Sequence, residues 1–344
     1  MRTGLITGAR RFELVDAPEP TPGPGVAVVE IDLCGICGSD VHAYQSGGPY
    51  SPTLCGHEWT GVVAAVGAEV SNVGEGDRVV GGAAPACGRC SFCQRGKTSW
   101  CSAALAGLMG RDGVSPHSGG FAPRQAVDAR RLTRAPASLS AAEAALVEPT
   151  TVAVHAVRRS RIRLGDVAVV IGAGPIGLLT AQAVRAAGAG LVVVAEPDDA
   201  RRALALELGA DAAYAPGAEL DEAVRVATMG VGPDHVFECA GVAATVQAAA
   251  RLARRGGALC LVGVAVDKAT IDPAMWVVKE LSVDASLAYG HEDTAIAAGL
   301  IADGRISAAP LHSATIGLDE LPETFEELAS GPSAKIKVLV DPRA

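Results

Sequence analysis

Aromatic side chains are scarce in this sequence. They make up 3% of its 344 residues, and charged residues make up only 19%. Positive charge is in deficit, because 29 Lys and Arg residues stand against 38 Asp and Glu residues, a net charge of −9. This balance argues against a surface that neutralises nucleic-acid phosphates. Because 49% of the residues are hydrophobic, the chain can still fill a large aliphatic core, and its length suggests about two domains.

Long apolar segments are also missing. The uncharged run at residues 167–184 is interrupted by three glycines and a proline, so we expect no membrane span. The first twenty residues contain several charges and no apolar core, which predicts no secretory leader. An odd number of cysteines, nine, argues against a disulfide scaffold and favours metal ligands or reactive thiols. We therefore expect a cytoplasmic protein.

The pattern of expected strands and helices changes twice along the chain. Short β-like runs such as Val26–Leu33, separated by Pro and Gly clusters, are typical of a compact β unit. From Gly165, apolar strands alternate with helices, which predicts a parallel sheet covered on both faces. The sequence therefore predicts an α/β chain in which a β-rich domain, residues 1–150 and 285–344, is interrupted by a doubly wound domain, residues 151–284.

Periodicity and turn residues also bound individual elements. Strands are expected at Val167–Ile171, Leu191–Ala195, His235–Cys239 and Ala258–Val264. Helices are expected at Ile176–Ala187, Asp199–Leu208, Leu220–Thr228, Ala243–Arg254, Glu292–Asp303 and Leu318–Ser330. Ser140 and Glu143 fit a capping box that begins a further helix, ending near Leu146.

The first strand of the doubly wound domain runs into a glycine-rich turn and the start of a helix, Val167–Gly177. Gly172 permits the tight turn, Gly174 lets the backbone approach a pyrophosphate, and Gly177 lets the helix pack against the strand. The helix N-terminus then offers N–H groups and its dipole to the phosphates. This context favours dinucleotide binding over an ordinary βαβ turn.

The residues after the next strand bear on the choice of dinucleotide. Glu196, about 20 residues beyond the turn, can accept hydrogen bonds from both ribose hydroxyls and would repel a 2′-phosphate, which predicts NAD. Arg201 and Arg202 follow closely, and they leave NADP open because arginine can hold a 2′-phosphate.

Four cysteines lie close together in a lobe at residues 86–102. Cys87, Cys90, Cys93 and Cys101 form the pattern C-x2-C-x2-C-x7-C. Four thiolates at this spacing can wrap one tetrahedral zinc ion and leave no open position, so we expect a structural zinc. An iron–sulfur cluster and free thiols are the alternatives, and the acidic balance argues against a nucleic-acid zinc module.

A second metal site is expected from dispersed residues, Cys37, His57, Glu58 and Glu148. Three protein ligands of mixed type leave an exchangeable position, which is the pattern of a catalytic zinc. From spacing alone the signal is weak, because a lone histidine is more often structural and Cys34 could pair with Cys37 as a redox CxxC. Buried, small hydrophobic roles are expected for Cys55, Cys239 and Cys260.

Together these motifs resemble the zinc-containing medium-chain alcohol and polyol dehydrogenases, the family of sorbitol, threonine and butanediol dehydrogenases. The matching stretches, in family order, are Cys37–His42, Gly56–Gly61, Gly74–Val79, the four-cysteine lobe, Val147–Thr150, Gly172–Gly177 and Ala195–Pro197. The resemblance implies a GroES-like catalytic domain interrupted by a Rossmann domain. Two features depart from it: Trp59, which could reshape the substrate pocket, and residues 105–117, which match no motif and are expected near the pocket mouth.

The resemblance also implies roles for the site residues. Cys37, His57 and Glu58 would hold the catalytic zinc, and Glu148 would either ligate it or hydrogen-bond its water. Ser39 would take the substrate proton, and His42 would pass it on by way of the nicotinamide ribose. The implied cofactor contacts are Gly172, Gly174, Pro175, Ile176, Gly177, Glu196, Arg201, Cys239, Ala240 and Val264.

We therefore expect an NAD-dependent enzyme with one catalytic and one structural zinc per chain. It would transfer hydride between NAD and a secondary alcohol, such as a polyol, a diol or a hydroxy amino acid. The expected partner is a small alcohol or ketone, with neither nucleic acid nor membrane, and the resemblance suggests a homotetramer or homodimer, partly through strand pairing near Ser282–Leu287.

Three other functions are weighed against this one. The first is an amino-alcohol or aminocyclitol dehydrogenase of secondary metabolism, for which Tyr44 or Glu148 beside a cationic substrate would fit. The second is a zinc-free quinone or enoyl reductase, which the predicted ligand set opposes. The third is a non-enzymatic regulator that binds zinc and a nucleotide.

Overall fold

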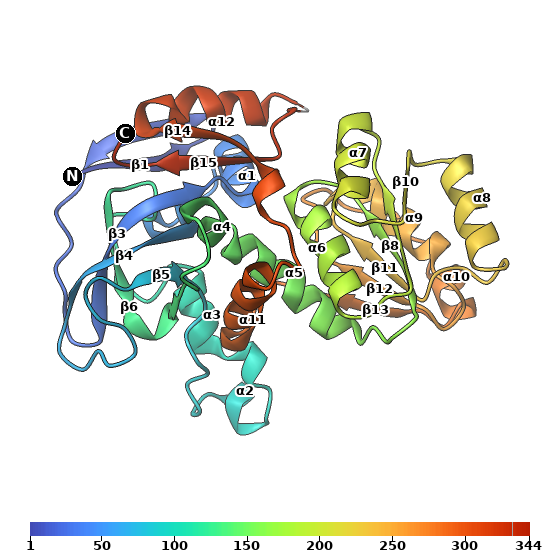
Figure 1. Ribbon diagram of the computed structural model, residues 1–344, viewed down its shortest axis with the longest axis horizontal. Coiled ribbons are helices and arrows are strands. Elements are labelled where there is room, and N and C mark those ends of the chain that lie inside the picture. Colours follow the sequence, from blue (N-terminus) through green and yellow to red (C-terminus); the bar gives the residue numbers. More distant parts are fainter. Residues whose placement is uncertain (332) are drawn as a thin grey trace. The chain divides into compact units, whose positions relative to one another are not determined.

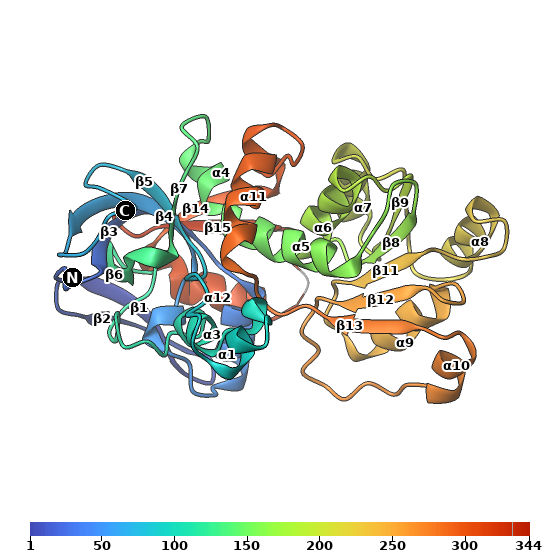
Figure 2. The same cartoon turned by 90° about the horizontal axis from the view of Figure 1, so that it is seen from below.

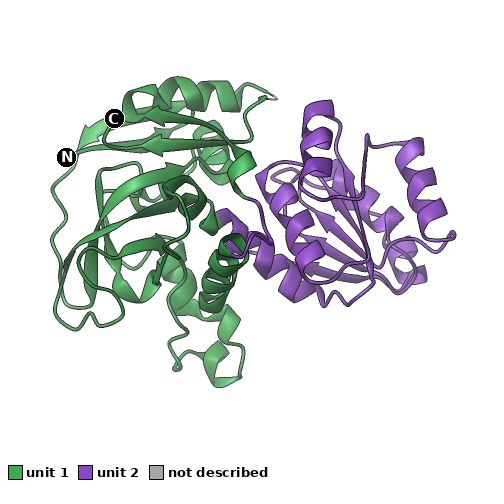
Figure 3. Cartoon of the chain, in the orientation of Figure 1, with its two compact units in different colours: residues 1–148, 290–302, 308–344 green, residues 149–289, 303–307 purple. Residues whose placement is uncertain are grey.

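The computed structural model describes residues 1–331 and 333–344. The chain divides into two compact units (Figure 3): unit 1 holds residues 1–148, 290–302 and 308–344, and unit 2 holds residues 149–289 and 303–307. The sequence placed the boundaries after residues 150 and 284. The short return of the chain to unit 2 was not expected, and it is explained by Ser307, whose backbone N–H donates to Gln182 Oε1 at 2.7 Å.

Unit 1 is built on a largely antiparallel sheet (Figure 1). Its strands are β1 (Arg2–Gly8), β2 (Arg11–Asp16), β3 (Val26–Gly35), β4 (Glu58–Val66), β5 (Arg78–Gly81), β6 (Arg124–Asp128), β7 (Leu132–Arg134), β14 (His312–Gly317) and β15 (Lys337–Asp341). The main sheet has the order β14-β15-β3-β4-β5-β7, with β6 also paired to β3, and β1 and β2 form a separate hairpin. Its helices are α1 (Gly38–Ser46), α2 (Ser91–Gln94), α3 (Ser102–Leu108), α4 (Ala141–Ala145), α11 (His291–Ala302) and α12 (Leu321–Ala329).

The core of unit 1 forms around the long central strand β3. Alternate side chains of this strand point inward, and those of Ala27, Val29 and Ile31 are completely buried. Trp59 joins this core with 3% of its surface exposed, and its ring lies so close to Gly81 that a Cβ there would be 2.6 Å from it. Trp59 therefore fills the core and does not line an open substrate pocket.

Unit 2 contains a parallel sheet with helices on both faces. Its strands are β8 (Val167–Ile171), β9 (Leu191–Ala195), β10 (Ala212–Tyr214), β11 (His235–Glu238), β12 (Ala258–Leu261) and β13 (Ser282–Ala285). Its helices are α5 (Val147–Ser160), which begins at the end of unit 1, α6 (Pro175–Ala186), α7 (Asp199–Glu207), α8 (Ala218–Ala227), α9 (Ala243–Leu252) and α10 (Pro273–Val278). The strand order β10-β9-β8-β11-β12-β13 confirms the predicted doubly wound sheet.

The arrangement of this sheet determines where its loops gather. Figure 1 shows α6 and α9 on opposite faces of the sheet, and Figure 2 shows β11, β12 and β13 side by side. The strand order reverses between β8 and β11, so the loops after these two strands lead to opposite faces at the carboxyl edge of the sheet. This is the usual position of a ligand on such a sheet.

Several element bounds differ from the expected ones. The strand expected at Ala258–Val264 ends at Leu261, because the N–H groups of Val262 and Gly263 both donate to the carbonyl of Glu238 and turn the chain. The long helix α5 was not predicted, since only its first residues were recognised as a motif. The capping box is confirmed: the Ser140 N–H donates to Glu143 at 2.9 Å, and the Glu143 N–H donates back to Ser140 Oγ at 3.2 Å.

The uncharged run at residues 167–184 is divided between β8 and α6. Throughout residues 1–331 and 333–344, no helix combines the length and apolar character needed to cross a membrane.

Candidate metal and dinucleotide sites

The structure brings Cys37, His57 and Glu58 together within unit 1. Cys37 precedes the first turn of α1, and Glu58 begins β4, where it pairs with Gly35 at the end of β3. The thiol, imidazole and carboxylate ligand atoms lie within 4.8 Å of one another. This spacing suits three ligands around one zinc ion, whose bonds to such atoms are about 2.0–2.3 Å long.

The neighbours of His57 decide which of its ring nitrogens faces an ion. Nδ1 lies 3.1 Å from the carbonyl oxygen of Leu54 and 3.6 Å from Asp40 Oδ1. Nε2 is therefore the nitrogen left for a metal, since a ligating histidine normally uses its other nitrogen to donate a hydrogen bond. Burial lowers the pKa of His57, but Asp40 and Cys37 together raise this pKa well above its ordinary value. The negative charges of Asp40 and Cys37 beside the ring favour a cation here, and a metal ion would have to displace the proton of His57.

Lys337 is a functional residue that the sequence analysis missed. Its Nζ donates to both carboxylate oxygens of Glu58, at 2.9 and 2.6 Å, and to the carbonyl of Ile36 at 3.0 Å. The side chains of Lys337 and Glu58 are 3% and 1% exposed, so Glu58 would share its charge between Lys337 and an ion. The available signal was a lysine at the start of the apolar strand Lys337–Asp341.

The other predicted catalytic residues, Glu148, Ser39 and His42, are not part of this cluster of three ligand groups. Glu148 is buried near the start of α5 and lies outside the set of three ligand groups. Burial lowers the pKa of Lys337, but the charges of Glu58, Cys37 and, to a smaller degree, Glu148 raise it. Ser39 and His42 are exposed on α1. Cys34 is completely buried, and its Sγ donates to the carbonyl of Gly35 at 3.7 Å. Cys34 is a free thiol, as is Cys37, so the structure does not show the alternative redox pair.

The lobe cysteines form a second group whose ligand atoms lie within 4.8 Å of one another: Cys87, Cys90, Cys93 and Cys101. Backbone N–H groups of Cys93 and Ser102 lower the pKa of Cys90 to about 6. Such N–H groups stabilise the thiolate, which is the form that binds a metal. The lobe has little apolar core, because Phe92 and Trp100 are 41% and 49% exposed. Its order would therefore depend on an ion.

We expect Cys90→Ser to remove the ion from the lobe and loosen the chain there, because three thiolates no longer close a tetrahedral site. Metal analysis should show zinc falling from about two ions per chain to about one. Limited proteolysis should then cut within residues 87–101, while alcohol oxidation persists. Unchanged zinc content in this variant would contradict the assignment of the lobe.

The glycine turn after β8 has the geometry that a pyrophosphate needs. Gly172 has a φ of +96°, which favours glycine. A Cβ at Gly177 would lie 1.8 Å from the carbonyl oxygen of Gly172, so the close packing of α6 requires glycine. A Cβ at Gly174 would meet nothing within 4 Å, which leaves its backbone open at the N-terminus of α6. The turn therefore fits the phosphates of a dinucleotide.

Glu196 lies directly beside this turn. It is 6% exposed, and its Oε2 accepts the N–H of Ala173 at 2.7 Å. Arg202 is occupied elsewhere, because its guanidinium donates to the carbonyls of Glu196 and Pro197, both at 2.8 Å, and pairs with Asp199. Glu196 Oε1 also accepts the N–H of Asp198 at 3.1 Å, so each carboxylate oxygen keeps one further acceptor site that a ribose hydroxyl could use, while one of the two candidate arginines is already engaged. Arg201 lies in the first turn of α7, where its N–H donates to Asp198.

The loops after β11 and β12 form the other end of the expected dinucleotide site. Ala240 and Val264 are exposed there, as is Val242 at 54%. Burial raises the pKa of the Cys239 thiol, which lies 3.7 Å from Thr180 Oγ1. These apolar surfaces at the carboxyl ends of the strands fit a nicotinamide ring.

Glu238 shapes this loop and was also missed. The side chain is completely buried, and its Oε1 accepts hydrogen bonds from the N–H groups of Ala240 and Gly241, both at 2.9 Å, and from the hydroxyl of Thr245 at 2.7 Å. The signal in the sequence was a glutamate at the end of an apolar strand.

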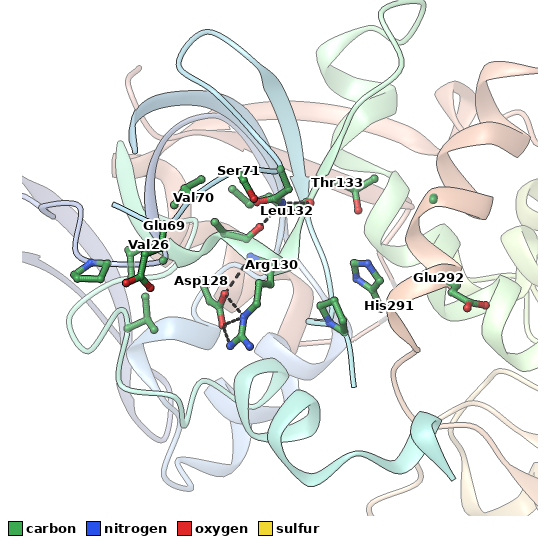
Figure 4. A pocket seen from close by; sticks show the side chains of 17 residues that line it. Val26, Glu69, Val70, Ser71, Asp128, Arg130, Leu132, Thr133, His291 and Glu292 are labelled. Carbon is green, nitrogen blue, oxygen red and sulfur yellow. Dashed lines mark hydrogen bonds and ion pairs between the residues drawn. The ribbon is translucent and has the colours of Figure 1, made fainter. Parts of the chain in front are cut away.

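A cavity of about 980 Å³ lies in another part of unit 1 (Figure 4). Turns at residues 24–26 and 69–72 line it, together with residues from 128–133 and 291–295. Arg130 and Asp128 form an ion pair on its wall, with Nε 3.0 Å from Oδ1. No predicted site residue lines this cavity, so its volume does not mark the catalytic centre.

Comparison with known proteins identifies the family. Residues 23–137 match the family model described as the alcohol dehydrogenase GroES-like domain, and residues 175–303 match the one described as zinc-binding dehydrogenase. The chain is 34% identical over 337 residues to 2-dehydro-3-deoxy-L-galactonate 5-dehydrogenase from Pseudoalteromonas atlantica, covering 97% of this chain and 96% of that protein. The chain belongs to the zinc-containing medium-chain alcohol dehydrogenases. It is an oxidoreductase that acts on CH–OH groups.

Two further comparisons agree with this medium-chain dehydrogenase assignment. L-idonate 5-dehydrogenase from Vitis vinifera is 33% identical over 346 residues, covering 97% of this chain and 93% of that protein. The crystal structure of a putative zinc-binding dehydrogenase from Sinorhizobium meliloti, bound to NADP, has a TM-score of 0.85 and 33% identity and covers 99% of each chain. The expected family and the GroES-like and Rossmann fold are confirmed.

Proposed function

We propose that this medium-chain dehydrogenase oxidises a secondary alcohol of a polyol or sugar acid to the ketone and passes the hydride to NAD. The convergence of Cys37, His57 and Glu58 carries the proposal. A zinc ion held there would supply a Lewis acid that lowers the pKa of the substrate hydroxyl. The two sugar-acid dehydrogenases among the relatives support this substrate class.

The exposed face of α1 can remove the proton that alcohol oxidation releases. Ser39 is two residues beyond Cys37, and its hydroxyl can take the substrate proton. His42 follows three residues later on the same helix, so the two side chains share a helix face and the imidazole can pass the proton on. The loops of unit 2 would hold the nicotinamide of NAD, which would supply the hydride acceptor, and the proton of the alcohol would leave through Ser39 and His42.

A substrate panel tests the proposal. Polyols, sugar acids, diols and 3-hydroxy amino acids are offered with NAD, before and after removal of zinc by a chelator. The proposal expects oxidation of at least one class, loss of that activity without zinc, and recovery when zinc is restored. Undiminished turnover in zinc-free protein would favour a zinc-free reductase, and binding of NAD without any turnover would favour a regulator.

Amino alcohols and aminocyclitols belong in the same panel. The alternative function loses one of its two supports, because Tyr44 is 4% exposed and its hydroxyl donates to Glu326 at 2.9 Å. The Tyr44 side chain is therefore not exposed for contact with a cationic substrate. Glu148 remains as the group that such a substrate could use.

Removal of the carboxylate of Glu196 should relax the preference for NAD. In Glu196→Ala the ribose hydroxyls lose a charged acceptor, and the repulsion of a 2′-phosphate disappears. A hydrogen bond to a charged group contributes about 1.5–3 kcal/mol, so the ratio of kcat/KM for NAD over NADP should fall roughly 10- to 150-fold. Steady-state kinetics with each cofactor checks this. Glu207→Ala, which removes an exposed carboxylate from the end of α7, the helix that follows Glu196, should leave the ratio unchanged. A wild-type preference for NADP would contradict our interpretation of Glu196.

We propose further that the protein is a homo-oligomer joined at β13. This strand is at the edge of the parallel sheet, all four of its residues are exposed, and Leu287 just beyond it is 67% exposed. An open strand edge flanked by apolar side chains favours pairing with a second copy. The choice between dimer and tetramer stays a prediction, as does the cytoplasmic location.

A further inference from the structure

Tyr50 lies in the segment between α1 and the stretch that carries His57. Its hydroxyl donates to Asp40 Oδ1 at 2.7 Å. This phenol hydroxyl therefore contacts the first turn of α1, directly beside the candidate metal ligand Cys37.

Asp40 connects this hydroxyl to two of the three candidate ligands. It is completely buried. Its Oδ2 accepts the backbone N–H of Cys37 at 2.9 Å, and its Oδ1 lies 3.6 Å from Nδ1 of His57. Tyr50 is thus the nearer partner of Oδ1, and it determines where that oxygen stands in relation to the His57 ring.

The donor in this arrangement is permanent. Burial raises the pKa of Tyr50, and the charge of Asp40 raises it further. The phenol therefore keeps its proton throughout the range in which the enzyme would work. Loss of its hydroxyl would leave one oxygen of a buried carboxylate without its closest donor, and such a group is costly enough to move in search of another.

We propose that Tyr50 is a positioning residue of the metal site: by holding Asp40 Oδ1 it acts together with the Leu54 carbonyl, 3.1 Å from Nδ1, to orient the His57 ring so that Nε2 stays directed at the ion shared with Cys37 and Glu58. Groups that orient a ligating histidine in this way contribute to metal affinity although they never touch the metal. The inference rests on the proposed zinc site and adds a residue that no recognised motif contains. Tyr50 itself would touch neither zinc nor NAD.

The experiment measures zinc affinity rather than turnover. Zinc-loaded wild type and Tyr50→Phe are titrated with a competing chromogenic chelator, and Cys37→Ser and Cys90→Ser identify which zinc leaves in which step. We expect Tyr50→Phe to weaken binding of the Cys37 zinc about 10- to 100-fold and to leave the lobe zinc unchanged. Tyr44→Phe is the matched control, because it also removes a hydroxyl that donates to a carboxylate and should change neither step.

A double-mutant cycle tests whether Tyr50 acts through Asp40. In an Asp40→Asn background the carboxylate charge is already gone, so Tyr50→Phe should cost much less additional affinity. Equal zinc affinity in Tyr50→Phe and wild type would overturn the proposal, and so would an equal loss in Tyr44→Phe or fully additive effects in the cycle. If the wild type held no zinc at the site of Cys37, His57 and Glu58, the proposed function itself would be rejected. Failure of the Tyr50 proposal and failure of the proposed function are therefore distinguishable.

Discussion

Cys37→Ser is expected to lower kcat/KM for the alcohol by at least about 10³-fold. A metal ion contributes several kcal/mol of charge stabilisation in such reactions, and each 1.36 kcal/mol corresponds to a factor of ten in rate. The change removes one of the three ligands that meet within 4.8 Å, so the ion should be lost or displaced. Steady-state kinetics and metal analysis on the same preparation check both consequences.

Cofactor binding provides the internal control for this variant. The glycine turn and Glu196 belong to unit 2, whereas Cys37 belongs to unit 1. The dissociation constant for NADH, measured by fluorescence, should therefore stay near the wild-type value in Cys37→Ser. Cys90→Ser also loses a zinc ion but should keep most of its activity. Full activity in Cys37→Ser would show that the three converging groups do not hold a catalytic ion.

Lys337→Met is expected to destabilise the zinc-free protein by about 3–5 kcal/mol. Removal of one partner from a buried ion pair leaves the other charge uncompensated, which accounts for a penalty of this size. Here the uncompensated group is Glu58, which accepts both of its short contacts from Lys337. Zinc at the site would supply positive charge to Glu58, so zinc should recover part of the loss. Urea unfolding of the zinc-free and zinc-loaded protein measures the loss of stability and the part of it that zinc recovers.

Lys335→Met is the matched control for this prediction. Lys335 is two residues earlier in the chain and pairs with Glu327 at 2.6 Å, but both side chains are partly exposed. Exposed pairs contribute about 1 kcal/mol or less. The prediction would be contradicted if the two variants lost similar free energy of unfolding, or if zinc did not reduce the loss in Lys337→Met. Either result would show that breaking the buried pair with Glu58 costs no more than breaking an exposed pair.

The sequence predicts best those features whose residues are close together along the chain. The glycine turn needs a strand, three glycines and a helix start, all within residues 167–177, and each has one local physical role. The parallel sheet likewise follows from apolar runs that alternate with helices. In contrast, the residue at which a strand ends depends on partners that are distant in the sequence. The strand that ends at Leu261 is an example, because the next two N–H groups, of Val262 and Gly263, both donate to the carbonyl of Glu238.

The residues of the candidate metal site also fall into those that the sequence predicts and those that only the folded chain reveals. Cys37, His57 and Glu58 were predicted with the help of family resemblance, because spacing alone does not show that separate segments meet. Lys337 and Tyr50 belong to no motif, and their significance depends on contacts with Glu58 and Asp40 that only the folded chain contains. Residue types indicate possible chemistry, but the partners that orient and neutralise them are determined by tertiary packing.

The separation of Glu58 and Lys337 affects how the protein is made. The two residues are 279 positions apart, and at about 5–20 residues per second a ribosome needs roughly 14 to 56 s to travel from one codon to the other. All residues of unit 2 emerge during that interval, so it can fold while the nascent chain still lacks the cation for its buried glutamate. Completion of the metal pocket should therefore be a late event in biosynthesis. Zinc added to stalled nascent chains that end before Lys337 should be held less firmly at this site than by the released protein.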